Sequence, residues 1–190
     1  MRITQLFFLL LLQNSIFAQK NPCEYATNLT DSIGTIKQTK GYLVYEKNFG
    51  NTSQYIFLSL LTENDTPKLN LQIIQKSPDF IAPKCVDKNS KVYFQLSNGK
   101  IYTFVSESEN KCDNLYYNNQ EKVNNRLLDS DFLFRKDDFE DLKKFSISLM
   151  RIKYASETID YILPKELNSE KLNEISEPER FFIANFSCIE

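Results

Sequence analysis

Residues 85–112 read CVDKNSKVYFQLSNGKIYTFVSESENKC and hold the strongest local structural signal in the chain. Two runs rich in β-branched and aromatic residues, Val92–Leu96 and Ile101–Val105, flank a tetrapeptide with Asn98-Gly99 at its centre. Asn-Gly favours a tight hairpin turn of type I′, because both central positions of that turn need positive φ. The stretch therefore predicts an antiparallel hairpin in which the numbers of opposed residues sum to 197, as for Leu96 and Ile101.

The four cysteines outside the N-terminal segment predict two disulfide bonds. Cys85 and Cys112 also sum to 197, so the same ladder, if extended, places them opposite each other and within disulfide reach. Closing this loop stabilises a fold by about 3–4 kcal/mol on the chain-entropy model. Elimination then pairs Cys23 with Cys188, which would tie the chain ends together. The alternative is that one or both of the latter cysteines stay free.

Aromatic residues of the hairpin offer a possible binding platform. In the predicted register Tyr93, Tyr102 and Phe104 share one face. If exposed, they would bind a sugar or a peptide; if covered, they belong to the core. Because both hairpin faces are apolar, the sequence favours a central hairpin that is covered on both sides.

Alternation of apolar and polar residues predicts further antiparallel strands on either side of the hairpin. Leu69, Leu71 and Ile73 alternate with Asn70 and Gln72, the pattern of a sheet with one wet face. The other expected strands lie at 41–47, 54–62, 146–154 and 158–163, whereas 19–34 and 113–125 are expected to be irregular.

Short helices are predicted in the C-terminal third, at Lys136–Lys144, at Ser169–Ile175 and from about residue 177 to Ser187. The last follows Ser176-Glu177-Pro178-Glu179, which has the form of a capping box. The predicted class is therefore α+β, sheet-dominated, with mostly antiparallel strands and hairpins and two or three short helices. A change of texture near residue 128 is interpreted as the boundary between two layers of a single domain spanning 19–190.

Residues 1–18 have the features of a cleaved export signal. Arg2 precedes the apolar run Leu6–Leu12, and Ala18 supplies a small residue at the cleavage site. The run is shorter than the roughly 20 residues of a spanning helix. The chain is therefore expected to be periplasmic or secreted, with no transmembrane segment after cleavage; a retained membrane anchor is the alternative.

Several chemistries are excluded by composition. The chain has no His, which removes Ser-His-Asp triads, Cys-His pairs and HExxH zinc sites. It has no C-x-x-C pair, only 4 Gly and a net charge of −2, so no phosphate loop, cofactor or metal is predicted and nucleic acid is not an expected partner.

A dense acidic group could bind calcium or supply a catalytic carboxylate pair, but a solvated turn and helix start is the favoured interpretation. Its members are Asp129, Asp131, Asp137, Asp138, Glu140 and Asp141. No catalytic residue is predicted.

Two functional hypotheses follow. The first is an exported, non-enzymatic domain that binds an unknown protein or glycan partner outside the cytoplasm. The alternative is a His-free hydrolase that uses carboxylates against an envelope polymer or glycan. The sequence leaves enzymatic activity open and favours its absence.

Overall fold

The structure is a computed structural model, and it describes residues 23–32, 34–134 and 139–189. Strands dominate this part of the chain, and every strand pair recorded in it is antiparallel. The sheet-dominated, antiparallel architecture predicted from sequence is thereby confirmed. The expected signal peptide, residues 1–18, lies outside the described residues.

The first layer is built on three strands of 12 residues each, β4 (Thr52–Glu63), β5 (Thr66–Ser77) and β11 (Val123–Phe134). They pair side by side in the order β4-β5-β11. Shorter strands extend the layer at its borders: β1 (Tyr25–Thr30), β2 (Thr35–Thr39), β3 (Tyr42–Phe49) and β10 (Asn114–Asn118). β2 and β3 both pair with β4, and β10 pairs with the first part of β11.

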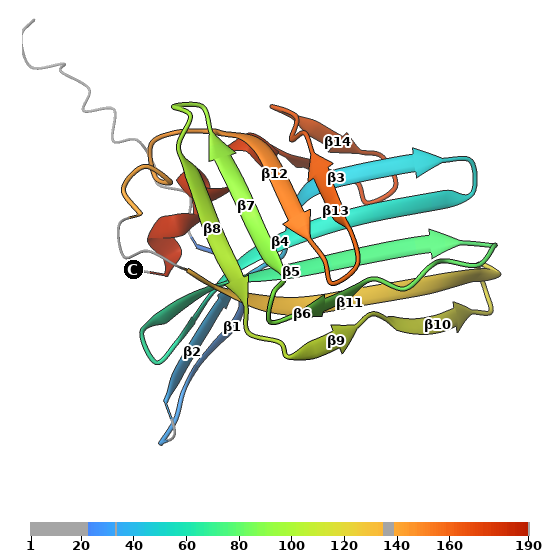
Figure 1. Ribbon diagram of the computed structural model, residues 1–190, viewed down its shortest axis with the longest axis horizontal. Coiled ribbons are helices and arrows are strands. Elements are labelled where there is room, and N and C mark those ends of the chain that lie inside the picture. The colour runs from blue at the N-terminus through green and yellow to red at the C-terminus, as the bar shows by residue number, and fades with distance from the viewer. Residues whose placement is uncertain (1–22, 33, 135–138, 190) are drawn as a thin grey trace, which may run out of the picture.

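The second layer continues the same sheet in the order β8-β7-β12-β13. Its strands are β7 (Lys91–Leu96), β8 (Ile101–Ser106), β12 (Ile147–Lys153) and β13 (Thr158–Tyr161). Only three residue pairs join β8 to β11. Beyond this junction the four strands cross steeply in front of the long strands of the first layer (Figure 1).

The core lies between the two layers and is closed by the C-terminal helix. Helix α1 (Phe181–Asn185) is flanked by the 3-10 turns η1 (Pro178–Arg180) and η2 (Phe186–Cys188). Phe182 packs its ring 4.9 Å from that of Phe94 and 5.8 Å from that of Phe104. These aromatic contacts attach the C-terminus to the inner side of the second layer, and burial of each such ring stabilises the fold by roughly 1.5–3 kcal/mol.

The β7–β8 hairpin forms, but its register differs by one residue from the prediction. Phe94 pairs with Tyr102 and Val92 with Phe104, so opposed numbers sum to 196. Leu96 N–H donates to the Lys100 carbonyl, and Gly99 alone in the loop has positive φ, at +83°. This is a three-residue loop with a glycine bulge, the alternative to the predicted type I′ turn.

The predicted Cys85–Cys112 disulfide is present, in a ladder of its own. β6 (Cys85–Asp87) and β9 (Asn110–Cys112) form a separate two-stranded sheet with the two cysteines opposed. Three residues separate β6 from the first pair of β7, and four residues cover the same step on the other side, which absorbs the difference between the two registers. The cysteine pairing was therefore correct although the hairpin register was not.

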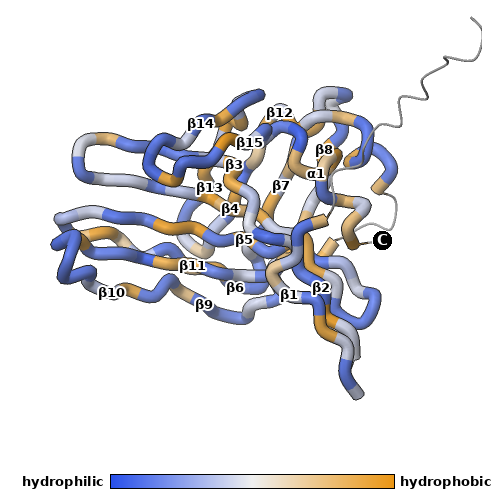
Figure 2. Tube along the Cα trace, turned by 180° about the vertical axis from the view of Figure 1, so that it is seen from behind, coloured by the Kyte–Doolittle hydropathy of each residue, from blue (hydrophilic) through white to orange (hydrophobic). Residues whose placement is uncertain are grey.

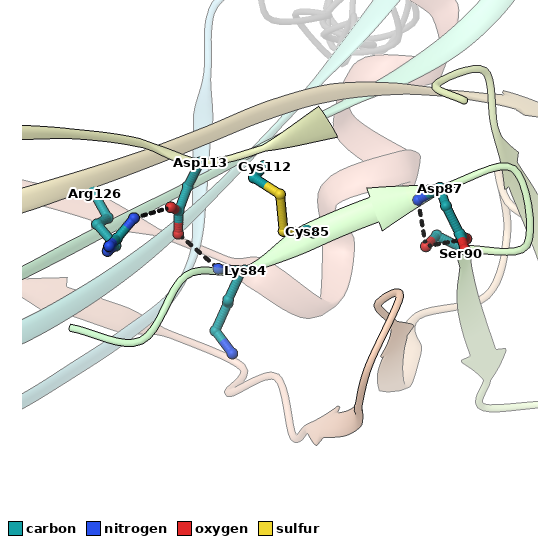
Figure 3. The surroundings of a disulfide bond; sticks show 7 residues. All are labelled: Lys84, Cys85, Asp87, Ser90, Cys112, Asp113 and Arg126. Carbon is teal, nitrogen blue, oxygen red and sulfur yellow. Dashed lines mark hydrogen bonds and ion pairs between the residues drawn. A yellow bond between two sulfur atoms is a disulfide. The ribbon is translucent and has the colours of Figure 1, made fainter. Parts of the chain in front are cut away.

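A buried ion pair reinforces the disulfide. Asp113 follows Cys112 and accepts hydrogen bonds from Arg126 Nη1 at 2.6 Å and from the Lys84 backbone N–H at 2.8 Å (Figure 3).

A second disulfide joins Cys23 to Cys188, the pair obtained by elimination. The residues just before β1 are thereby joined to η2, the turn that follows α1.

Two predicted helices are replaced by other structure in the described residues. The segment 169–175 instead contributes to a hairpin of β14 (Leu167–Ser169) and β15 (Glu174–Ser176), with Asn173 at a φ of 51°. Ile175 is 68% exposed, so no buried apolar face supports a helix there. Residues 140–144 form turns, and the α-type hydrogen bond recorded there runs from Phe145 N–H to the Asp141 carbonyl; residues 136–138 lie outside the described residues.

The capping-box interpretation is also wrong, although a helix follows it. Ser176 Oγ donates to the Leu43 carbonyl at 2.8 Å, and the residue that precedes η1 makes no side-chain cap. The Ser176 hydroxyl thus binds a distant strand and does not cap the helix. The described chain contains one short α-helix, α1, where two or three were predicted.

Both segments predicted as irregular contain strands, namely β1 within 19–34 and β10 with the start of β11 within 113–125. Asn118 Oδ1 accepts from the backbone N–H groups of Gln120 and Glu121, so the Asn-rich stretch supplies a hairpin turn. Residue 128 lies inside β11, so the predicted layer boundary is wrong. No helix among the described residues is long and apolar enough to cross a membrane.

Candidate functional site

The outward side of the second layer presents a compact grid of side chains, here called the outer face. Strand registers place Tyr93 between Thr103 of β8 and Arg151 of β12, and Arg151 opposite Asp160 of β13. In Figure 1 these strands lie in front of the first layer, so their outer face is turned toward the viewer. The outer face comprises Lys91, Tyr93, Gln95, Ile101, Thr103, Leu149, Arg151, Lys153, Thr158 and Asp160.

Strand alternation creates this face. Val92, Phe94 and Leu96 point into the core and are at most 1% exposed, so the residues between them must point the other way. The same alternation on β12 buries Met150 and Ile152 completely and leaves Arg151 and Lys153 exposed. The outer face is thus a direct consequence of how the core is packed.

A shallow hollow of about 610 Å³ lies over this face. Its lining includes the half-buried Tyr93 and the apolar side chain of Ile101, which is 57% exposed. Gln95 and Thr103, which carry hydrogen-bonding side chains, also line the hollow. The hollow therefore brings together an aromatic side chain and hydroxyl, amide and cationic groups.

Arg151 is held in place by its neighbour across the strands. Its Nε and Nη2 donate to the two carboxylate oxygens of Asp160 at 2.5 and 2.7 Å. This forked pair lowers the pKa of Asp160 and raises the pKa of Arg151, chiefly through the hydrogen bonds themselves. The guanidinium is therefore positioned beside Tyr93 before any ligand arrives.

Lys91 and Lys153 are directly opposed on β7 and β12. Among the described residues, no ion pair to a carboxylate involves either of them. Like charges directly across an antiparallel pair destabilise a sheet. Lys91 and Lys153 lie two positions along their strands from Tyr93 and its partner Arg151, so this end of the outer face carries two positive charges without an ion-pair partner among the described residues.

The structure separates the three aromatic residues proposed as one platform. Tyr102 and Phe104 point inward and are 8% and 1% exposed, whereas Tyr93 points outward. The one-residue register difference explains why Tyr102 and Phe104 lie on the opposite side from Tyr93. Because the side with Tyr93 is open to solvent, the expectation of a hairpin covered on both sides is wrong. Arg151 and Lys153 were missed; their alternation with Met150 and Ile152 was the available signal.

The four acids of the group that the structure describes are dispersed over different elements. Asp129 and Asp131 lie on β11 and accept hydrogen bonds from Asn70 Nδ2 at 2.6 and 2.7 Å. They are strand residues, which corrects the interpretation of this pair as part of a solvated turn. No cluster of three or more metal-ligating side chains occurs among the described residues.

The other acids of the group have separate neighbours or lie outside the structure. Glu140 pairs with Lys143 and Lys144, and Asp141 pairs with Lys100, whose hydrogen bond lowers the pKa of that carboxyl. Asp137 and Asp138 are outside the described residues.

A larger hollow of about 890 Å³ lies on the first layer, over Tyr55, Phe57 and Tyr116. Three lysines line it: Lys171 Nζ donates to Ser53 Oγ at 2.8 Å, Lys76 pairs with Glu121 at 3.2 Å, and Lys122 has no ion pair among the described residues. We regard the outer face as the stronger candidate site, because two lysines whose side chains have no polar partner in the described part of the chain are directly opposed there, and the larger hollow has a single such lysine.

Comparison of the chain with protein-family models, with curated proteins and with solved structures yields no match.

Proposed function

We propose that the protein is an exported, non-enzymatic binding domain that holds an acidic polysaccharide on its outer face. The observation that carries this proposal is the directly opposed Lys91–Lys153 pair, two positions along the strand register from the Tyr93–Arg151 pair, with Lys153 and the half-buried Tyr93 both lining the hollow. An aromatic ring binds the apolar side of a sugar ring, and two ammonium groups without an internal partner suit the carboxylate or sulfate groups of an acidic glycan.

The disulfides support a location outside the cytoplasm. Two disulfide bonds are compatible with an exported chain, since the cytoplasm keeps most thiols reduced. The predicted signal in residues 1–18 points the same way. An envelope or extracellular polymer is therefore the ligand source that fits this compartment.

A polysaccharide fits the outer face better than a peptide does. Extended peptides usually bind at a free strand edge, where main-chain hydrogen bonds supply affinity. At the centre of the outer face, β7 and β12 each pair with a strand on both sides, so their backbone groups are already used. A ligand here must be recognised by side chains alone, and sugar hydroxyls and rings match Gln95, Thr103 and Tyr93.

The hydrolase alternative rests on Asp129 and Asp131. Because one Asn70 Nδ2 donates to both at 2.6 and 2.7 Å, the two accepting oxygens lie at most about 5.3 Å apart, too close for an inverting pair and no wider than a retaining one. However, Asp129 also accepts from Gln72 Nε2 at 3.0 Å. The carboxylates thus serve as acceptors in a cross-strand network on the first layer, apart from the outer face.

Isothermal titration calorimetry of the mature protein with an oligogalacturonate tests the proposal. The double variant Lys91→Gln/Lys153→Gln should bind about tenfold more weakly, because it loses two charge contacts of up to about 1 kcal/mol each. Tyr93→Ala should also weaken binding. The matched control Lys88→Gln/Lys165→Gln removes the same charge elsewhere and should bind like the parent.

Two comparison ligands decide between interpretations. A neutral glucose oligomer should bind far more weakly than the oligogalacturonate. Stronger binding of polyglutamate would replace the glycan by an acidic polypeptide, and equal loss in both double variants would remove the outer face from the account.

A further inference from the structure

β10 (Asn114–Asn118) is a border strand with a free edge. It pairs with β11 on one side only. Figures 1 and 2 show it at the rim of the sheet from both sides, with no described strand beyond it. Backbone N–H and C=O groups on such an edge can pair with a strand from another chain.

The side chains of β10 do nothing to discourage pairing. Leu115, Tyr116 and Tyr117 are 53%, 51% and 54% exposed. The strand contains no charged residue and no proline, and its register with β11 is unbroken. Natural edge strands normally carry a charge, a proline or a bulge that prevents association.

Other border strands of the sheet have these protective features. β1 has an irregular register between Tyr25 and Thr27. β3 has one between Leu43 and Tyr45, and it also carries charged residues. β13 has only four residues and includes Asp160. Among these borders of the described sheet, β10 is therefore the one suited to pairing with another chain.

We propose that the occupant of this edge is β10 of a second copy of the chain. The strand reads Asn114-Leu115-Tyr116-Tyr117-Asn118, which is nearly the same in both directions. Antiparallel self-pairing with the two-fold axis at Tyr116 places asparagine opposite asparagine and Leu115 opposite Tyr117 of the partner subunit. A self-complementary patch is what a two-fold interface requires, and the absence of charge avoids repulsion between identical strands.

The resulting dimer joins the first layers of two subunits into one continuous sheet. A five-residue seam buries less than a standard interface of about 1,600 Å², so the dimer should be weak and depend on concentration. The seam lies on the first layer and does not use the outer face. The inference therefore holds whether or not the proposed ligand binds.

Engineered disulfides test the register. With the axis at Tyr116, Tyr116→Cys faces itself at about 4.5–5.5 Å between Cα atoms, within disulfide reach. Tyr117→Cys, equally exposed, would stand about 8 Å from its own copy, beyond that reach. Mild oxidation and non-reducing intact mass should give a dimer for the first variant and a monomer for the second. Equal cross-linking of both would contradict the register.

Sedimentation measures the association itself. The parent protein should show a concentration-dependent monomer–dimer equilibrium, and Tyr116→Lys should weaken it at least tenfold by opposing two ammonium groups. Phe80→Lys, at a residue 80% exposed outside the strand, is the matched control and should leave it unchanged. A parent that stays monomeric up to millimolar concentration, or equal loss in both variants, would overturn the proposal.

Discussion

The two faces of the β7–β8 hairpin differ in environment: side chains on one face are buried in the core, and side chains of the neighbouring residues face solvent. On the inner side Phe94 and Phe104 are at most 1% exposed, and their rings lie 5.3 Å apart. On the outer side, one position away, Tyr93 and Thr103 face solvent beside Arg151. The comparison teaches that packing fixes alternate residues of a strand and leaves the others available for a ligand, even for charges that weaken the sheet.

The largest expected effect is on the inner side. Phe94→Ala should lower the free energy of unfolding by about 3–5 kcal/mol, because it leaves a cavity among Phe104 and Phe182. Gln95→Ala, the next residue, should change it by less than about 0.5 kcal/mol. Urea denaturation measures both. Similar losses in the two variants would contradict the division between the faces.

Removal of the Cys85–Cys112 disulfide should have the second-largest effect on the free energy of unfolding. The double variant Cys85→Ala/Cys112→Ala should lose about 3–4 kcal/mol of unfolding free energy, because the unfolded chain regains loop entropy. The outer face is held by its own strand pairs, so oligogalacturonate affinity should be retained. Loss of affinity in a variant that remains folded would show that the disulfide positions the site.

The buried tyrosines Tyr154 and Tyr161 should make the stability of the fold depend on alkaline pH. The hydroxyls of Tyr154 and Tyr161 lie 3.0 Å apart, and burial raises the pKa of both. Because the folded pKa exceeds that of the unfolded chain, this contribution is complete below pH of about 10 and is lost as pH rises further. Urea midpoints measured between pH 8 and 11.5 should therefore fall. Tyr154→Phe should show a shallower fall, and an unchanged slope would contradict the assignment.

The smallest expected effect on stability occurs on the outer side, and its sign is reversed. Lys153→Glu places a carboxylate opposite Lys91, so the free energy of unfolding should rise by about 0.2–1 kcal/mol. Oligogalacturonate binding should be lost in the same variant. Thermal unfolding and calorimetry on one sample measure both quantities. A variant that is destabilised, or that still binds, would remove the argument from uncompensated charge.

Short sequence patterns correctly predicted several strands, one hairpin and one disulfide. Alternation located β5, the β7–β8 hairpin and the β12–β13 pair, and cysteine spacing located Cys85–Cys112. Asn98-Gly99 signalled a turn, but one-residue differences in turn type are decided by strand twist and packing. That single step moved Tyr93 to the opposite side from Tyr102.

The features that sequence patterns did not predict depend on contacts between residues that are far apart in the chain. The Asn-rich segment became β10 because β11 offered a paired edge, and Ser176 failed to cap a helix because the Leu43 carbonyl took its hydroxyl. The outer face depends on Lys91 and Lys153, which are 62 residues apart in the chain and meet only through the β7–β12 register. No local motif contains that information.

The most direct test of the central claim is a heteronuclear NMR titration of the labelled mature protein with oligogalacturonate. We predict that the backbone amide signals of Tyr93, Thr103, Arg151 and Lys153 shift together and saturate, while those of Tyr55 and Phe57 on the first layer stay in place. Shifts confined to Tyr55, Phe57 and Tyr116, or no saturable shift at all, would contradict the assignment of the outer face as the binding surface.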